Sequence, residues 1–318
     1  MRNRSLFTLL TCFAGGVLLC AGASAVRAQA SDQLRFDTPE DAMKALLEAT
    51  KAKDRPQMRK IFGVEPGELA SGDEVQDQAD LDQFAKHLAA AAKLVKEGDD
   101  RVILQVGPEA YPFPVPLVRK DGKWYFDTPA GKEEILNRRI GENEIKAMAV
   151  CRGYAAAQRE YHSQDWNGDG VVEYAQRLAS TPGKKDGLYW ETSEDEPPSP
   201  LGPMVAEAQA EGYGKATSRL TTQPSTGPRP YHGYCYKVLT RQGPHAPGGK
   251  FDYVINGHMV AGFALVAWPV DYDSSGVMTF ILNTNGKLYQ KDLGEKTAEI
   301  ARDMTEYDPD ETWALVKD

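Results

Sequence analysis

The sequence predicts an α+β protein. Its first part combines helices with a small antiparallel sheet, and its last part combines a long helix with a second antiparallel sheet. Apolar residues recur at helical spacing over residues 38–53 and 142–163, whereas short segments of the C-terminal third alternate apolar and polar residues. The dipeptides Asp121-Gly122 and Asn285-Gly286 are typical of the tight turns that join antiparallel strands.

Three helices are predicted before the first strand. The first spans residues 38–53, because Thr38 is a favourable N-cap and Pro39 a favourable first helical residue. A second helix is expected over residues 55–62 and a third over residues 80–95, where apolar residues recur every three to four positions.

The spacing of apolar residues then changes to two, which predicts a strand over residues 101–106. Prolines at positions 112, 114 and 116 keep the next segment extended but exclude it from the middle of a sheet. The turn at Asp121-Gly122 leads back into a strand over residues 124–126. We therefore expect residues 31–140 to form an N-terminal α+β domain.

A second domain is expected over residues 141–318, beginning with a long helix over residues 142–163. A loop at 164–172 should then lead into a short helix that ends near Leu178, and residues 204–211 are also expected to be helical. Strands are predicted at residues 234–240, 251–255, 262–267, 277–282 and 287–291, followed by a short helix at 297–304.

Residues 1–30 have the three parts of a cleavable export signal. Arg2 and Arg4 provide the positive start, an apolar run follows, and Ala28-Gln29-Ala30 matches the small-x-small cleavage pattern. A retained anchor is the alternative, since about twenty apolar residues can span a bilayer. The small residues in the run favour cleavage before Ser31. We therefore expect no membrane span after cleavage, and a periplasmic or extracellular location.

The charge balance excludes some classes of partner. The chain has 37 basic and 46 acidic residues, and loss of residues 1–30 would remove three basic residues and no acidic one. An acidic protein without basic blocks is not expected to bind nucleic acid. Cys151 and Cys235 would remain after cleavage, either as a disulfide or as two buried free thiols.

Two parts of the sequence resemble known families. The order of elements over residues 36–128, with the KDGKWYFD hairpin, resembles the cone-shaped folds typified by nuclear transport factor 2, which implies a curled sheet. The part from Glu142 onward, with GYAAAQREY, WNGDGVVEYA and WPVDYDSSGVMTFILNTNGKLYQKDLG, resembles the globular domain of pilins and pseudopilins. Pilins place their helix directly behind an apolar N-terminal segment, whereas here a whole domain intervenes, so the usual filament assembly is not implied.

The chain as a whole resembles one exported bacterial family, DUF2950. The resemblance rests on PFPVPLVRKDGKWYFDTPAGKEEILNRRIGENE, AQREY, GLYW, GYCYKVLTRQG and WPVDYDSSGVMTF. These stretches are spread over nearly all of the chain that follows the signal. The resemblance implies an exported two-part protein with no established activity.

Residues 165–176 follow the spacing of a calcium-binding loop. Oxygen ligands would come from Asp165, Asn167, Asp169, Val171 and Glu173, with the Val171 oxygen supplied by the main chain. Gly170 falls where such loops turn sharply, but Gln176 replaces the bidentate glutamate at position twelve, so the affinity should be weak. The alternative is a plain helix–turn–helix connection, because Asn-Gly-Asp-Gly is also a good turn.

The sequence contains no known catalytic constellation at convincing spacing, and its five histidines lack the spacing of a zinc site. The leading hypothesis is therefore a non-catalytic cell-envelope protein that acts through binding or assembly, with calcium as a candidate cofactor. A carrier that holds a small ligand in a cone-shaped N-terminal pocket is an alternative. A hydrolase of unrecognised type is another.

Overall fold

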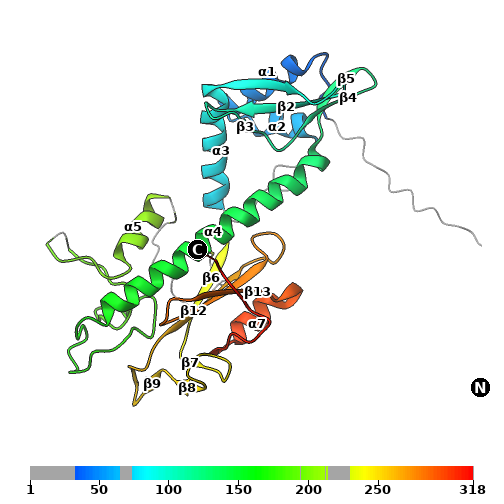
Figure 1. Cartoon of the computed structure of the whole chain (residues 1–318). Coiled ribbons are helices and arrows are strands. Elements are labelled where there is room, and N and C mark those ends of the chain that lie inside the picture. Colours follow the sequence, from blue (N-terminus) through cyan, green and yellow to red (C-terminus); the bar gives the residue numbers. More distant parts are fainter. Residues whose placement is uncertain (1–32, 65–73, 194, 212, 214–229, 318) are drawn as a thin grey trace, which may run out of the picture. The chain divides into compact units, whose positions relative to one another are not determined.

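The computed structural model describes residues 33–64, 74–193, 195–211, 213 and 230–317 (Figure 1). Its helices and antiparallel sheets confirm the α+β fold class. The predicted signal peptide, with Cys12 and Cys20, lies outside the described residues. Among the helices that are described, none is long and apolar enough to cross a membrane.

The first two helices begin where their capping residues predict. Helix α1 (Pro39–Lys51) starts after Thr38, whose hydroxyl accepts a hydrogen bond from the main-chain N–H of Asp41. Helix α2 (Arg55–Phe62) starts after Asp54 and ends at Gly63 in the left-handed conformation.

The prediction for the third helix was partly wrong. Helix α3 spans Glu74–Ala90, and residues predicted to complete it instead form strand β1 (Ala92–Lys96). This strand pairs antiparallel with β2 (Arg101–Val106) along its whole length. Pairing with β2 aligns Leu94 with Leu104 and gives every residue of the segment a partner in an antiparallel strand, which overrides its helical spacing.

The N-terminal sheet has the order β1-β2-β4-β5, with the short β3 (Tyr111–Pro112) paired to β2. Strands β4 (Leu117–Lys120) and β5 (Lys123–Phe126) form the predicted hairpin, in which Asp121 and Gly122 both have positive φ. The core beneath these elements contains Phe62, Phe113 and Phe126, whose ring centres lie 5.3–6.1 Å apart.

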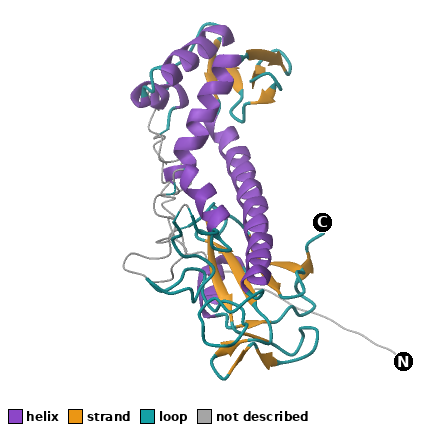
Figure 2. Ribbon diagram, turned by 90° about the vertical axis from the view of Figure 1, so that its left-hand side faces the viewer, coloured by secondary structure: helices purple, strands orange, loops and turns teal. Residues whose placement is uncertain are grey.

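Helix α4 (Thr128–Tyr161), labelled in Figure 1 and drawn among the purple helices of Figure 2, begins well before the predicted start at residue 142. The Asp127 side chain caps it by accepting from the N–H of Ala130. The first turns bury Gly131 against Val115, and the later turns contribute to a separate buried core in the C-terminal part. The predicted domain boundary at 140/141 thus falls within one continuous helix.

The C-terminal sheet is antiparallel, with the order β15-β13-β12-β11-β6. Its strands are β6 (Tyr234–Leu239), β11 (Ala264–Pro269), β12 (Met278–Asn283), β13 (Leu288–Asp292) and β15 (Ala314–Leu315). Helix α4 contacts β11 and β12, and α7 (Thr297–Asp303) contacts β11. Asn285-Gly286 lies in the turn between β12 and β13, as predicted.

Smaller elements complete the C-terminal part. Helix α5 spans Gly202–Ala210, close to its predicted position, and η2 (Gly294–Lys296) directly precedes α7. The predicted strand at 251–255 is divided at the buried Tyr253, so β8 (Phe251–Asp252) and β9 (Val254–Ile255) join different partners. Strand β8 pairs with β7 (Arg241–Gln242), which also pairs with β14 (Glu306–Tyr307), whereas β9 pairs with β10 (His258–Met259).

Cys151 on α4 and Cys235 on β6 are both free and buried. Burial raises the pKa of each thiol to about 12, so little thiolate forms near neutral pH. Of the two alternatives that the sequence left open, the structure shows the buried free thiols.

Near its middle, α4 is fixed by a polar contact to the connection between β11 and β12. Asn143 is buried, and its side-chain amide donates to the Ser275 carbonyl at 2.9 Å.

Asn143→Ala would leave this carbonyl without its partner, so we expect the free energy of unfolding to fall by about 1–3 kcal/mol in urea titrations. Glu142→Ala changes an exposed neighbour and should cost less than about 0.5 kcal/mol. Equal losses in the two variants would contradict the importance of the Asn143 contact.

Candidate cation site at residues 165–173

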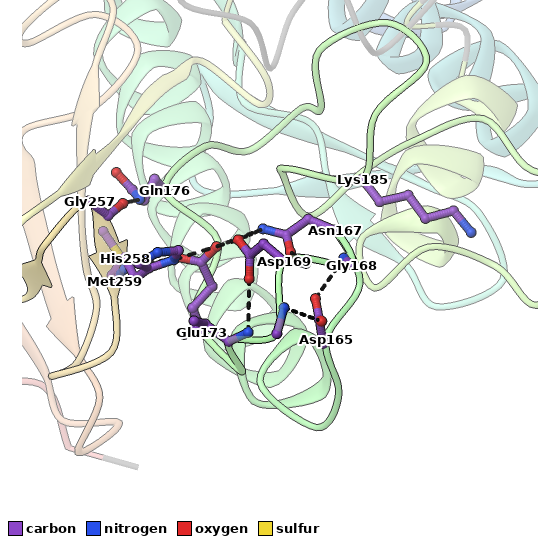
Figure 3. Close-up of polar contacts among 12 residues, drawn as sticks. Asp165, Asn167, Gly168, Asp169, Glu173, Gln176, Lys185, Gly257, His258 and Met259 are labelled. Carbon is purple, nitrogen blue, oxygen red and sulfur yellow. Dashed lines mark hydrogen bonds and ion pairs between the residues drawn. The ribbon is translucent and has the colours of Figure 1, made fainter.

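The loop that follows α4 carries all the predicted calcium ligands (Figure 3). Its first acidic residue, Asp165, accepts hydrogen bonds from the main-chain N–H groups of Gly168 (2.7 Å) and Gly170 (2.8 Å). Both glycines have positive φ, which residues with a Cβ adopt less readily. These hydrogen bonds, the one from Gly170 foremost, lower the pKa of Asp165 and favour its charged form.

Asn167 and Asp169 also accept hydrogen bonds from main-chain N–H groups further along the loop. The Asn167 carbonyl oxygen accepts from the N–H of Asp169 at 3.1 Å, and one Asp169 oxygen accepts from the N–H of Val171 at 2.9 Å. The Asn167 amide also donates to the second Asp169 oxygen (2.7 Å) and to Glu173 (2.9 Å). The three side chains at positions one, three and five are therefore gathered into one loop by its own amides.

Glu173 is almost completely buried and connects the loop to β10. Its Oε2 accepts from the N–H of Met259 at 3.0 Å, and the main chain of Tyr174 pairs with Met259 in an isolated bridge. Gln176 donates to the carbonyl of Gly257 at 2.6 Å. The side chain at position twelve of the predicted calcium loop is therefore directed to the β9–β10 hairpin (Figure 3).

The short helix predicted to end near Leu178 is absent from this described segment, because tertiary contacts hold its main chain in a non-helical conformation. Gln158 of α4 is fully buried, and its side-chain oxygen accepts from the N–H of Ala175 while its amide donates to the carbonyl of the same residue (both 2.8 Å). With its main-chain groups bonded to a side chain, Ala175 cannot also make helical hydrogen bonds. The predicted helix–turn–helix connection was therefore wrong.

The structure brings one further candidate ligand to the loop, which the spacing of residues in the sequence did not predict. His258 on β10 places its Nδ1 3.6 Å from Asp169 Oδ2 and 3.4 Å from Glu173 Oε2. These three atoms all lie within 4.8 Å of one another, and they form a cluster that could hold a metal ion. Local spacing rules cannot find such a cluster, because the β9–β10 hairpin brings His258 to the loop from a distant part of the chain.

Aromatic side chains pack beside the loop. The Trp166 ring lies 5.0 Å from that of Trp190 and stacks on Tyr161 at 6.4 Å. The Lys185 ammonium is 5.9 Å from the centre of the Trp166 ring and 5.3 Å from that of Trp190. Since Trp166 lies between two predicted ligands and contacts the core, its fluorescence should report changes in the loop.

Comparison with models of known families identifies the family of this chain. A family model described as protein of unknown function (DUF2950) matches residues 33–316. The chain belongs to the DUF2950 family. The DUF2950 match includes the loop, the β9–β10 hairpin and both buried cores. The chain matches no curated protein and no solved structure, so the likeness of its C-terminal part to pilins stays a prediction.

Proposed function

We propose that this DUF2950 protein is an exported, non-catalytic component of the cell envelope that acts through binding or assembly, with calcium bound weakly at residues 165–173. Export is supported by the signal pattern of residues 1–30, and the expected location is periplasmic or extracellular. Its partner is expected to be another envelope protein. The observation that carries the calcium proposal is the gathering of Asp165, Asn167 and Asp169 by the amides of their own loop.

The side-chain oxygens of the loop can bind a cation in addition to accepting hydrogen bonds from the loop itself. Each carboxylate oxygen has about two lone-pair positions, and the N–H groups of Gly168 and Gly170 bond different oxygens of Asp165. Calcium is a hard cation that takes six to eight oxygen ligands, including carboxylates and carbonyls. A bound ion would also offset the repulsion among Asp165, Asp169 and Glu173, and it would stabilise the connection between α4 and β10.

A non-catalytic role is supported by the chemistry of the most nucleophilic side chains. Both cysteine thiols are buried, with pKa values raised to about 12, so they are weak nucleophiles at neutral pH. The carrier hypothesis requires an N-terminal pocket, but the described N-terminal core packs Phe62, Phe113 and Phe126 ring against ring. This packing does not favour a carrier.

Calcium titration of the purified protein, followed by tryptophan fluorescence and by the melting temperature, tests the proposal. We expect a saturable fluorescence change with a midpoint of about 0.1–1 mM, which is the range of weak extracellular sites. The melting temperature should rise over the same range, because an ion bound only to the folded state stabilises it. Magnesium at equal concentration should produce a smaller change, since it prefers a rigid octahedral shell.

Two variants separate specific binding from charge screening. Asp165→Asn should abolish the saturable change, whereas Asp186→Asn should preserve it. Asp186 is a suitable control because it is a nearby acidic residue that also accepts a main-chain hydrogen bond, from Thr181, but belongs to a different turn. No saturable change up to about 10 mM calcium, or the same change in both variants, would refute calcium binding at this loop.

A further inference from the structure

We propose that Asp169, Glu173 and His258 form a site for a divalent cation of the zinc class. The site shares two carboxylates with the calcium loop, but its third ligand is a nitrogen from β10 and it uses neither Asp165 nor Asn167 as a ligand. It therefore does not depend on calcium binding. Imidazole and carboxylate together suit zinc and similar transition metals, whereas calcium takes oxygen ligands.

The separations between the three ligand atoms fit a shared ion. His258 Nδ1 lies 3.4 Å from Glu173 Oε2 and 3.6 Å from Asp169 Oδ2. Both separations exceed the usual length of an N–H···O hydrogen bond. Ligands about 2.0–2.1 Å from a tetrahedral zinc ion are about 3.3 Å apart, so only small movements are needed to bind one. Among the described residues, His258 Nδ1 is also a buried polar atom that makes no hydrogen bond.

Hydrogen bonds from main-chain N–H groups and from the Asn167 side chain hold both carboxylates in place. Glu173 accepts from the N–H of Met259, and Asp169 accepts from the N–H of Val171. The Asn167 amide donates to both carboxylates, so it fixes their separation from the side of the loop (Figure 3). Such outer contacts orient metal ligands and increase affinity by restricting their motion.

The site is open to solvent on one side. The side chains of His258 and Asp169 are 32% and 36% exposed, whereas that of Glu173 is only 11% exposed. Three protein ligands would leave a fourth position of a tetrahedral ion for water or for a group from a binding partner. A metal here would therefore connect the loop to β10 and also present a coordination position at the surface.

The test is titration of the chelator-treated protein with zinc by calorimetry, and with cobalt by visible absorption. We expect one zinc ion per chain and a cobalt spectrum typical of low-coordinate geometry. His258→Gln should lower the zinc affinity at least about tenfold and abolish the cobalt spectrum, since it removes the nitrogen ligand. Far-UV circular dichroism of the metal-free variant should match that of the original protein, because His258 is partly exposed.

Matched variants identify the site and separate it from the calcium proposal. His245→Gln removes a surface histidine that contacts Asp308 and should leave zinc affinity within about twofold, as should Asp165→Asn. Asp165→Asn is expected to remove calcium binding alone, so failure of either proposal would be seen separately. Absence of saturable zinc binding up to about 100 µM, or unchanged affinity in His258→Gln, would overturn the zinc proposal.

Discussion

Gln158→Leu is expected to lower the free energy of unfolding by about 3–4 kcal/mol, because both main-chain groups of Ala175 would lose their partner and the buried Tyr154 hydroxyl would lose its donor. The Gln158 side chain bonds both main-chain groups of Ala175, and its amide also donates to the Tyr154 hydroxyl at 2.8 Å. Leucine has a similar size, so the loss would come from the polar groups and not from a large cavity. Urea unfolding at neutral pH measures the effect.

Two further variants show whether the hydrogen bonds are responsible. Gln176→Leu changes an exposed glutamine of the same segment, whose side-chain amide donates to the Gly257 carbonyl, and should cost less than about 1 kcal/mol. Gln158→Glu would place a carboxyl group in a buried site, where its pKa should be raised above the unfolded value. This variant should be more stable at pH 4 than at pH 7 relative to the original protein. The same loss for Gln158→Leu and Gln176→Leu would be evidence against the argument.

Because of the titration of His232, the free energy of unfolding should decrease as the pH falls from about 6.5 to about 4. Burial lowers the pKa of this histidine from 6.5 to about 4, and the nearby Lys146 adds to the shift. Its Nδ1 lies 3.5 Å from the Tyr213 hydroxyl, and its Nε2 lies 3.3 Å from a Glu211 carboxylate oxygen. A neutral ring protonated on Nε2 can satisfy both contacts, so neither nitrogen needs the charge in order to keep its partner.

Proton linkage gives the direction and size of this effect. Above pH 6.5 the histidine is neutral in both states, so its contribution is fully present. Between pH 6.5 and about 4 only the unfolded chain takes up the proton, which costs the folded state about 3 kcal/mol in total. Urea titrations at pH 7, 6, 5 and 4 measure the loss in the free energy of unfolding.

The His232→Asn variant isolates this contribution from that of the acidic residues. Asparagine tolerates the positive φ of position 232, and it does not titrate in this range. The variant should therefore lose less stability than the original protein between pH 6.5 and 4. Parallel pH profiles for the two proteins would exclude His232 as the cause.

His245 provides a comparison of opposite sign. Its hydrogen bond with Asp308 raises its pKa, so its contribution is fully present below pH 6.5 and is lost as the pH rises through the folded pKa. Removing His245 should therefore change the profile only above pH 6.5.

The sequence predicted local features well where one or two residues determine the backbone. Thr38 and Asp54 mark the starts of α1 and α2, because their side chains bond the free amides of the first turn. The Asp121-Gly122 turn likewise supports positive φ at both positions. The candidate calcium ligands are close in sequence, so their gathering in one loop could also be predicted.

The sequence by itself thus determined the α+β class, the capped helices, the tight turns and the position of the turn that contains the candidate calcium ligands. Only the tertiary structure decided that residues 92–96 form a strand, because β2 offers them an antiparallel partner along their whole length. It also decided that the segment after the loop is not helical, since Gln158 bonds both main-chain groups of Ala175. His258 reaches Asp169 and Glu173 through the packing of the β9–β10 hairpin. Such contacts depend on which distant segments pack together, and local sequence patterns do not specify that choice.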